Sequence, residues 1–213
     1  MDIVSPPVSE HELIQRVNAL SGLTLAQLAG LHELAVPKSL NRVKGWIGQL
    51  LERALGTDAG TASIPDFTGL NIELKTIPVD RLGNPQESTY VTVVPLLGAP
   101  GLCWQSSGVR LKLAKVLWIP IEAGADKAIA DRRVGQGFIW SMDAIAEAAL
   151  RADWEELMDY VLMGQLEQVS GSIGQYLHIR PKAAHSKVLT WGIGPEGGKV
   201  QTLPRGFYLR AQF

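Results

Sequence analysis

The sequence predicts an α/β protein in which helices flank a central mixed sheet of about five strands. Three observations indicate this class. Helix patterns with caps and glycine stops fill the first 56 residues, and strand patterns appear from residue 72 onward. Residues 192–197 spell G-x-G-x-x-G, but they contain a proline and precede no helix, so we interpret them as a hairpin turn rather than a dinucleotide site.

Three helices are predicted in the N-terminal third. Each begins after a serine or threonine that can cap the first turn. The first two caps are followed three residues later by Glu or Gln, which is the capping-box pattern. Glycine ends a helix readily because it adopts the left-handed conformation without strain. The predicted caps are Ser9, Thr24 and Ser39, and the predicted helix ends are Gly22 and Gly56.

Strands are predicted where apolar and polar residues alternate, or where apolar residues form a short continuous run. The predicted strands span residues 72–77, 88–96, 116–121, 175–179 and 206–209, with a short additional strand at 138–140. Ser141 and Asp153 are predicted to cap two further helices, the second of which ends at Gly164. These elements complete the α/β pattern.

The stretch from Asp66 to Pro78 carries the clearest chemical pattern. Glu73 and Lys75 are two residues apart on the predicted strand, which places both side chains on one face. Asp66 lies upstream, and a turn beyond Gly69 could bring it back to the same place. Two carboxylates can hold Mg²⁺, and a lysine beside them can activate water or stabilise phosphate charge. The pattern is typical of a metal-dependent phosphodiesterase, although an exposed Glu-x-Lys pair is also a common solvated face.

The charges are unevenly distributed along a chain whose formal net charge is −1. Residues 142–169 contain seven acidic residues and one arginine, whereas residues 170–213 contain six basic residues and one glutamate. A near-neutral protein can in this way present one basic face to phosphates. We interpret the acidic run as a solvated helix face.

Cysteine usage and hydropathy limit the class further. The single Cys103 excludes an internal disulfide and a multi-cysteine zinc site, which fits a reducing compartment. No apolar run reaches membrane-spanning length and no signal-peptide pattern opens the chain, so we expect a cytoplasmic protein without a membrane partner. The four histidines lack metal-ligand spacing and are expected to be surface or capped residues.

Five blocks of the sequence, in order, resemble the MutH family of methyl-directed mismatch-repair endonucleases, which nick unmethylated GATC sites. The blocks are KGWIG at 44–48, LNIELKTIPVD at 70–80, VLWIP at 116–120, DWEELMD at 153–159 and LPRGFYL at 203–209. The resemblance implies a restriction-endonuclease-like fold with two lobes that form a DNA-binding cleft. About residues 1–100 are assigned mainly to catalysis, and about 101–213 mainly to DNA reading. Family members also continue into a C-terminal helix, whereas this sequence ends at Phe213.

The resemblance assigns roles in an active site. Asp66 and Glu73 are expected to be the metal ligands, with the backbone carbonyl of Leu74 as a third contact. Lys75 is expected to orient or activate the attacking water. The expected ion is Mg²⁺; Mn²⁺ is expected to substitute for it, and Ca²⁺ to bind without supporting cleavage.

Two further residues enter the active site only through the resemblance. Glu52 is expected to be an accessory acid that helps to place a second ion or a bound water, although the common alternative is a surface glutamate. Lys112 is expected to stabilise charge on the phosphate. Whether one ion or two take part stays open at this point.

Base reading is expected from the basic C-terminal third. Arg180 and Lys182 flank Pro181, a rigid arrangement suited to a guanine edge or to phosphates. Tyr208 matches the family position that senses the adenine amino group, where methylation changes the contact; it could equally be a core aromatic. Further expected DNA contacts are Tyr90, Lys44 and Arg205.

Three functions remain open. The favoured one is a monomeric, MutL-activated enzyme that nicks the unmethylated strand 5′ to the G of GATC in unmethylated or hemimethylated double-stranded DNA, and that meets MutS through MutL. The second is a stand-alone GATC-specific type II restriction endonuclease. The third is a non-catalytic DNA-binding protein, which is disfavoured because all the expected catalytic residues are present together.

Overall fold

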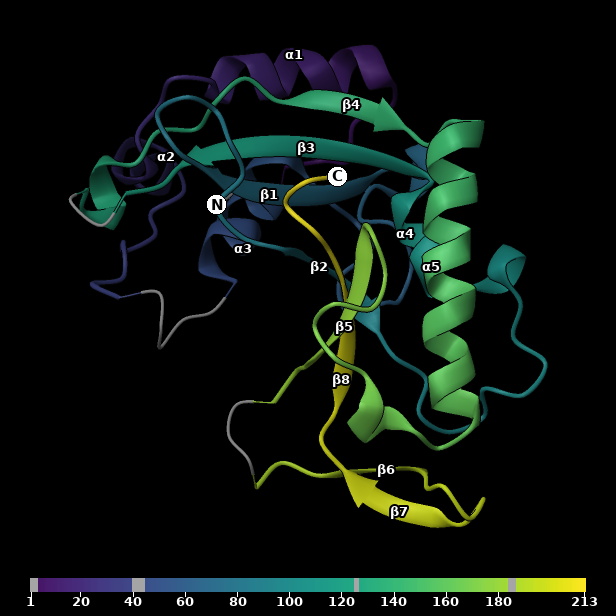
Figure 1. Cartoon of the computed structure of the whole chain (residues 1–213). Coiled ribbons are helices and arrows are strands. Elements are labelled where there is room, and N and C mark those ends of the chain that lie inside the picture. The colour runs from purple at the N-terminus through teal and green to yellow at the C-terminus, as the bar shows by residue number, and fades with distance from the viewer. Residues whose placement is uncertain (1–3, 40–44, 125–126, 184–186) are drawn as a thin grey trace. The chain divides into compact units, whose positions relative to one another are not determined.

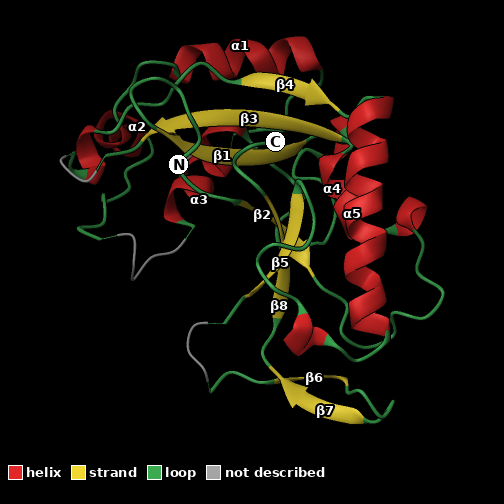
Figure 2. Cartoon of the chain, in the orientation of Figure 1, coloured by secondary structure: helices red, strands yellow, loops and turns green. Residues whose placement is uncertain are grey.

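The computed structural model describes residues 4–39, 45–124, 127–183 and 187–213 (Figure 1). Helices and strands are mixed along the chain, which confirms the predicted α/β class (Figure 2). The chain divides into two compact units, each built from two separate stretches. The first unit comprises residues 1–87 and 114–141, and the second comprises residues 88–113 and 142–213.

In its described residues, the first unit contains three α-helices and a three-stranded mixed sheet. Strand β1 pairs with β3 in parallel, and β3 pairs with β4 in antiparallel orientation, which gives the order β1-β3-β4. Figure 1 shows the three strands side by side. The elements are α1 (Glu10–Leu20), α2 (Leu25–Leu31), α3 (Trp46–Leu55), β1 (Glu73–Val79), β3 (Lys115–Glu122) and β4 (Phe138–Ser141).

The core of the first unit joins these helices to the sheet. Every helix contributes apolar residues from one stripe, as amphipathic helices do when they cover a sheet. The core residues with no exposed surface include Leu13, Val17, Leu25, Leu28, Leu51, Leu55, Ile72, Leu117 and Ile119. This packing fixes the N-terminal end of β1, where the predicted acidic residues lie.

The described part of the second unit contains an antiparallel sheet of order β2-β8-β5, a separate β6–β7 hairpin and two α-helices. Its elements are β2 (Thr89–Val93), α4 (Gly108–Leu113), α5 (Ala144–Leu162), β5 (Leu177–Pro181), β6 (Thr190–Ile193), β7 (Lys199–Thr202) and β8 (Arg205–Leu209). Residues that alternate along β5 and β8 are buried, namely Leu177, Ile179, Phe207 and Leu209. Because side chains alternate across a strand, the residues between them lie on the opposite face.

Every predicted strand region contains a strand, and the hairpin turn predicted at 192–197 joins β6 to β7. The prediction of one central sheet is wrong for the described residues, because the strands form three separate sheets. Strand β2 follows β1 in sequence but pairs with β8 near the end of the chain. Local periodicity predicts that a segment is a strand without indicating its partner.

Two of the predicted helix caps are confirmed and three are wrong. Ser9 and Thr24 cap α1 and α2 through their side chains. The third helix begins after Gly45 rather than near Ser39. Ser141 does not cap a helix either: it ends β4, and Asp143 caps α5, which continues through Asp153.

Asp153 accepts three main-chain hydrogen bonds instead of capping a helix. Its carboxylate is buried and receives the amide protons of Gln175 at 2.8 Å, Tyr176 at 2.6 Å and Leu177 at 2.8 Å. These bonds hold the start of β5 against α5. None of the helices in the described part of the chain is long and apolar enough to span a membrane.

Candidate active site

A tight turn brings Asp66 beside the start of β1. Phe67 and Ile72 pair across this turn through two main-chain hydrogen bonds of 2.9 and 3.3 Å. Asn71, at φ 54°, adopts the left-handed conformation that the reversal needs, which Asn tolerates better than most residues. The Asp66 Oδ2 atom then accepts a hydrogen bond of 2.8 Å from the Leu74 amide. The structure therefore folds Asp66 back as predicted, with Asn71 as the turning residue beyond Gly69.

Glu73 and Lys75 form an ion pair on β1. Lys75 Nζ lies 2.5 Å from Glu73 Oε1, and the two side chains are 13% and 3% exposed. Burial at this level rules out the solvated Glu-x-Lys face that the spacing also allowed. A buried ion pair adds little net stability, because removing both charges from water offsets much of their attraction. A pair kept at such a cost is a reasonable candidate for chemistry.

The oxygen atoms at this end of β1 fit a hard divalent cation in chemical type. Asp66 and Glu73 contribute carboxylates, and Leu74 lies between them in contact with Asp66. Mg²⁺ typically takes one or two carboxylates and completes its shell with water and substrate phosphate oxygens. In the described ranges, no group of three or more His, Cys, Asp and Glu side chains is arranged to hold a metal. Glu52 is therefore not grouped with the two acids.

Glu52 and Lys112 lie on helices α3 and α4 rather than on β1. Glu52 is half-buried on α3, with Oε1 at 3.8 Å from where a Cβ on Gly48 would stand. Lys112 is half-buried in the last turn of α4, which belongs to the second unit. Their active-site roles remain predictions.

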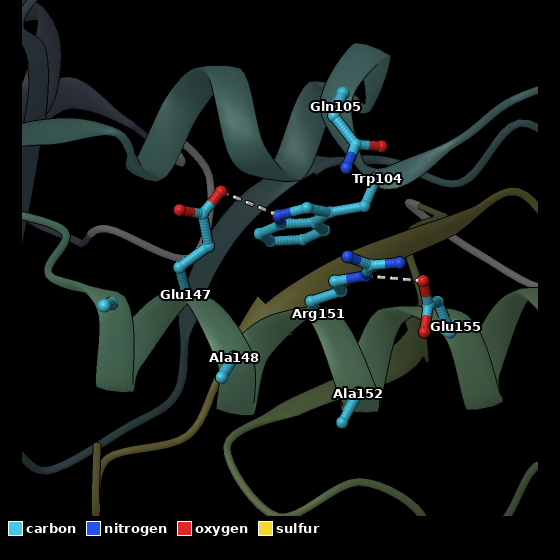
Figure 3. A pocket seen from close by; sticks show the side chains of 8 residues that line it. Trp104, Gln105, Glu147, Ala148, Arg151, Ala152 and Glu155 are labelled. Carbon is cyan, nitrogen blue, oxygen red and sulfur yellow. Dashed lines mark hydrogen bonds and ion pairs between the residues drawn. The ribbon is translucent and has the colours of Figure 1, made fainter.

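The helix that carries Lys112 is fixed to α5. Arg110 Nε lies 2.7 Å from Glu147 Oε1, and the same oxygen accepts a 3.1 Å hydrogen bond from the indole of Trp104. The indole–Glu147 bond lies at a hollow of about 470 Å³. Figure 3 shows this bond and the pairing of Arg151 with Glu155 along α5. Because the hollow contains none of the predicted site residues, we interpret it as part of the packing between α5 and the short 3-10 helix Trp104–Ser106.

Most of the predicted DNA-reading residues gather on one face of the β2-β8-β5 sheet. Tyr90 stands opposite Tyr208 across β2 and β8, and His178 stands opposite Tyr208 across β5 and β8. Arg180 and Lys182 follow His178 at intervals of two, which keeps all three side chains on the same face. We call these five residues the reading face.

The basic groups of the reading face lie against its aromatic rings. The guanidinium carbon of Arg180 is 5.5 Å from the centroid of the Tyr208 ring, and Lys182 Nζ is 3.2 Å from the centroid of the Tyr90 ring. Cations are attracted to the faces of such rings. Arg180, Pro181 and Lys182 are all exposed, so their polar groups are accessible to a ligand.

Burial changes the ionisation of two groups on the reading face. Desolvation lowers the pKa of His178 to about 4, assisted by the positive charges of Arg210 and Arg180. Desolvation also raises the pKa of the Tyr208 hydroxyl, against a smaller opposing effect of Arg180. At neutral pH both side chains are therefore uncharged.

Three predicted DNA contacts are not among these five residues. Pro181 lies between Arg180 and Lys182, and side chains alternate along a strand, so Pro181 is on the other side of β5. Lys44 lies outside the described residues. Arg205 is only 9% exposed and its Nη2 donates to Glu167 Oε1 at 3.1 Å, so a contact with DNA would require this pair to open. Its role as a DNA contact stays a prediction.

Sequence reasoning missed His178 and Gly206. His178 was expected at the surface or in a cap, yet it is 7% exposed. Its spacing of two from Arg180 and of four from Lys182 was the available signal. Gly206 leaves space for two rings: a Cβ there would lie 2.9 Å from Tyr90 Cε2 and 3.1 Å from Tyr208 Cε2.

The two sites together have the chemistry of a metal-dependent nuclease. Paired carboxylates beside a lysine suit hydrolysis of a phosphodiester. An exposed basic and aromatic sheet face suits contact with phosphates and bases. These features define the class of protein, and comparison with known proteins defines the family.

Residues 55–153 match the family described as MutH, DNA mismatch repair enzyme MutH. The chain is 51% identical over 211 residues to the DNA mismatch repair protein MutH of Escherichia coli O17:K52:H18 (strain UMN026 / ExPEC), covering 99% of this chain and 92% of the relative. It is 50% identical, with the same coverage, to the protein of that name from Escherichia coli O6:K15:H31 (strain 536 / UPEC). The chain therefore belongs to the MutH family, the GATC-directed nicking endonucleases of DNA mismatch repair.

Proposed function

We propose that this protein nicks the unmethylated strand of double-stranded DNA 5′ to the G of GATC, by Mg²⁺-dependent hydrolysis of the phosphodiester, and that MutL activates it. Family membership supports a DNA substrate and mismatch-repair partners. The observation that carries the chemical proposal is the arrangement at β1, where Asp66 is hydrogen-bonded to the Leu74 amide beside the buried Glu73–Lys75 pair.

The metal would be held by Asp66, Glu73 and the backbone carbonyl of Leu74. When bound, the ion supplies Lewis-acid stabilisation of charge at the scissile phosphate. Lys75 would orient the attacking water with its ammonium group, since it is fixed by Glu73 and is mostly shielded from solvent. Shielding strengthens such an electrostatic contact.

Two predicted residues would support the same step from other elements. Glu52 on α3 would act as the accessory acid, and Lys112 on α4 would stabilise the negative charge on the phosphate. Hydrolysis breaks the bond from phosphorus to the 3′-oxygen, which leaves as a hydroxyl, while water forms the new bond to phosphorus. The family resemblance at Glu52 and Lys112, and the partial burial of both side chains, support these two roles.

Sequence specificity would come from the reading face and from Pro181 beside it. Arg180, Pro181 and Lys182 would contact the guanine edge or nearby phosphates, and Tyr208 would meet the adenine amino group in the major groove. Tyr90, Lys44 and Arg205 would be further DNA contacts. About residues 1–100 would thus mainly carry the chemistry and about residues 101–213 mainly the reading, in the two-lobed, restriction-endonuclease-like organisation that the family implies. We also infer that the protein is cytoplasmic, as expected from the sequence. We infer a monomer, because nicking one strand needs only one active site.

Supercoiled plasmid that contains GATC tests this proposal. With Mg²⁺, open circles should form, and should increase when a MutL-type ATPase is added. Linear product that needs no partner would instead identify a stand-alone type II restriction endonuclease. Intact supercoiled plasmid under all conditions would identify a non-catalytic DNA-binding protein, and a plasmid without GATC is the matched control.

A further inference from the structure

The ring of Tyr208 is bordered by side chains from both neighbouring strands. The centroid of the Tyr90 ring lies 5.5 Å away at an interplanar angle of 67°, and that of the His178 ring lies 6.2 Å away at 77°. Both are edge-to-face contacts, which aromatic pairs favour. Arg180 lies over the Tyr208 ring as the third neighbour. Because β8 is the central strand, its tyrosine is flanked on both sides.

His178 contacts the Tyr208 ring by van der Waals packing of its own ring, rather than by charge or hydrogen bonding. It is 7% exposed, and within the described residues its buried Nε2 atom has no hydrogen-bond partner. Burial keeps the imidazole neutral, since its pKa falls to about 4. A buried polar atom without a partner is uncommon in proteins and calls for an explanation. His178 therefore packs a neutral, flat ring against Tyr208 from the neighbouring strand β5.

We propose that His178 is a positioning residue for methylation discrimination, which holds the Tyr208 ring from the β5 side so that it cannot move aside. This inference rests on the proposed role of Tyr208 as the sensor of the adenine amino group. A tyrosine ring can exclude a methyl group sterically only if the ring cannot be displaced when methylated DNA binds. Tyr90 blocks movement towards β2, and His178 blocks movement towards β5.

The measurement is the ratio of nicking rates on fully methylated and unmethylated GATC duplexes of one sequence. His178→Ala removes the ring and opens a space beside Tyr208, so this ratio should rise by roughly tenfold or more, the scale of discrimination that one small group provides. His178→Phe restores a flat ring and should return the ratio close to that of the parent. A second readout is the ratio of dissociation constants for the two duplexes with Ca²⁺ in place of Mg²⁺, which requires no cleavage.

Ile179→Ala is the matched control. Ile179 is the next residue on β5, is 4% exposed and faces the opposite side of the sheet. It should lower the melting temperature while the methylation ratio stays at the parent value. If Ile179→Ala raises the ratio as much as His178→Ala, or if His178→Phe fails to restore it, His178 has no positioning role.

Tyr208→Ala separates failure of this inference from failure of the proposed function. If Tyr208→Ala admits methylated DNA but His178→Ala does not, Tyr208 is the sensor and the inference about His178 is wrong. If neither variant admits methylated DNA, the sensor lies elsewhere and both proposals fail. If His178 acts through Tyr208, the double variant should admit no more methylated DNA than Tyr208→Ala alone.

Discussion

Lys182 Nζ lies 3.2 Å from the centroid of the Tyr90 ring, so a cation directly after β5 is held against an aromatic ring of β2. Arg180 lies over Tyr208 in the same manner. Each contact is worth about 0.5–1 kcal/mol at an exposed site. Side chains ordered in this way lose less freedom when they bind a ligand, which favours affinity and selectivity.

The Glu73–Lys75 pair should be essential for nicking. Lys75→Ala and Glu73→Gln should both abolish open-circle formation, since one loses the ammonium and the other a metal-ligand charge. Lys75→Ala should also lower the free energy of unfolding by about 3 kcal/mol, because it leaves the buried Glu73 carboxylate without this cation.

Denaturant unfolding and plasmid nicking of the same samples measure the two effects. Glu155→Gln, which breaks the exposed Arg151–Glu155 pair, is the control and should change stability by less than about 1 kcal/mol with nicking retained. Activity in either β1 variant would remove the assignment of this site.

Arg180 and Lys187 should affect DNA binding differently. Arg180→Ala should cost about 1–3 kcal/mol of affinity on GATC and much less on a scrambled duplex, if Arg180 reads a guanine. Lys187 is exposed, and Lys187→Ala should weaken binding to both duplexes equally and reduce the salt slope by about one. Equal losses on both duplexes for Arg180→Ala would place it among the phosphate contacts.

Tyr208→Ala should raise the nicking rate on fully methylated GATC relative to the rate on unmethylated GATC. A methyl group on the adenine amino group adds bulk in the major groove, where the tyrosine ring is proposed to lie. Without the ring, fully methylated GATC should be nicked at a rate closer to that of unmethylated GATC. Nicking rates on unmethylated, hemimethylated and fully methylated duplexes provide the comparison, and an unchanged ratio would show that Tyr208 serves packing alone.

Gly206→Ala should disturb the reading face by crowding. The new methyl group would lie 2.9 Å from Tyr90 Cε2 and 3.1 Å from Tyr208 Cε2, so both rings must shift. Repacking of this kind costs about 1–3 kcal/mol of stability, and the selectivity for GATC should fall with it. Gly69→Ala, at a position with open space, is the control for thermal melting and binding. If Gly206→Ala keeps the melting temperature and GATC selectivity of the parent, Tyr90 and Tyr208 do not pack closely against Gly206.

Acid should destabilise the fold through His178. Its folded-state pKa of about 4 lies below the ordinary value of 6.5, so the unfolded chain binds the proton more readily. Stability should be full above pH 6.5 and should fall by up to about 1.4 kcal/mol per pH unit from there towards pH 4. His178→Phe should flatten that part of the curve, measured by urea unfolding. A variant with the same slope as the parent would show that other groups cause the acid effect.

Local patterns predicted the strands, two helix caps and the pairing of Glu73 with Lys75, because each depends on residues close in sequence. The burial of His178 depends on Tyr208, which lies on another strand, and the role of Asp153 depends on amides 22 to 24 residues away. Sequence periodicity contains no information on such partners. The same limit applies to the sheets, since β2 pairs with a strand from the far end of the chain.

Each unit is assembled from two separated stretches, and the chain passes from one to the other after residues 87, 113 and 141. Neither unit can therefore be produced by trimming one end of the gene product. During synthesis on the ribosome, the first sheet cannot close until β4 has emerged, by which time β2 and α4 are already exposed without their partners β8 and α5. Those early segments must wait for the C-terminal residues, so a prematurely terminated chain would display an unpaired β2 edge, which is a template for aggregation.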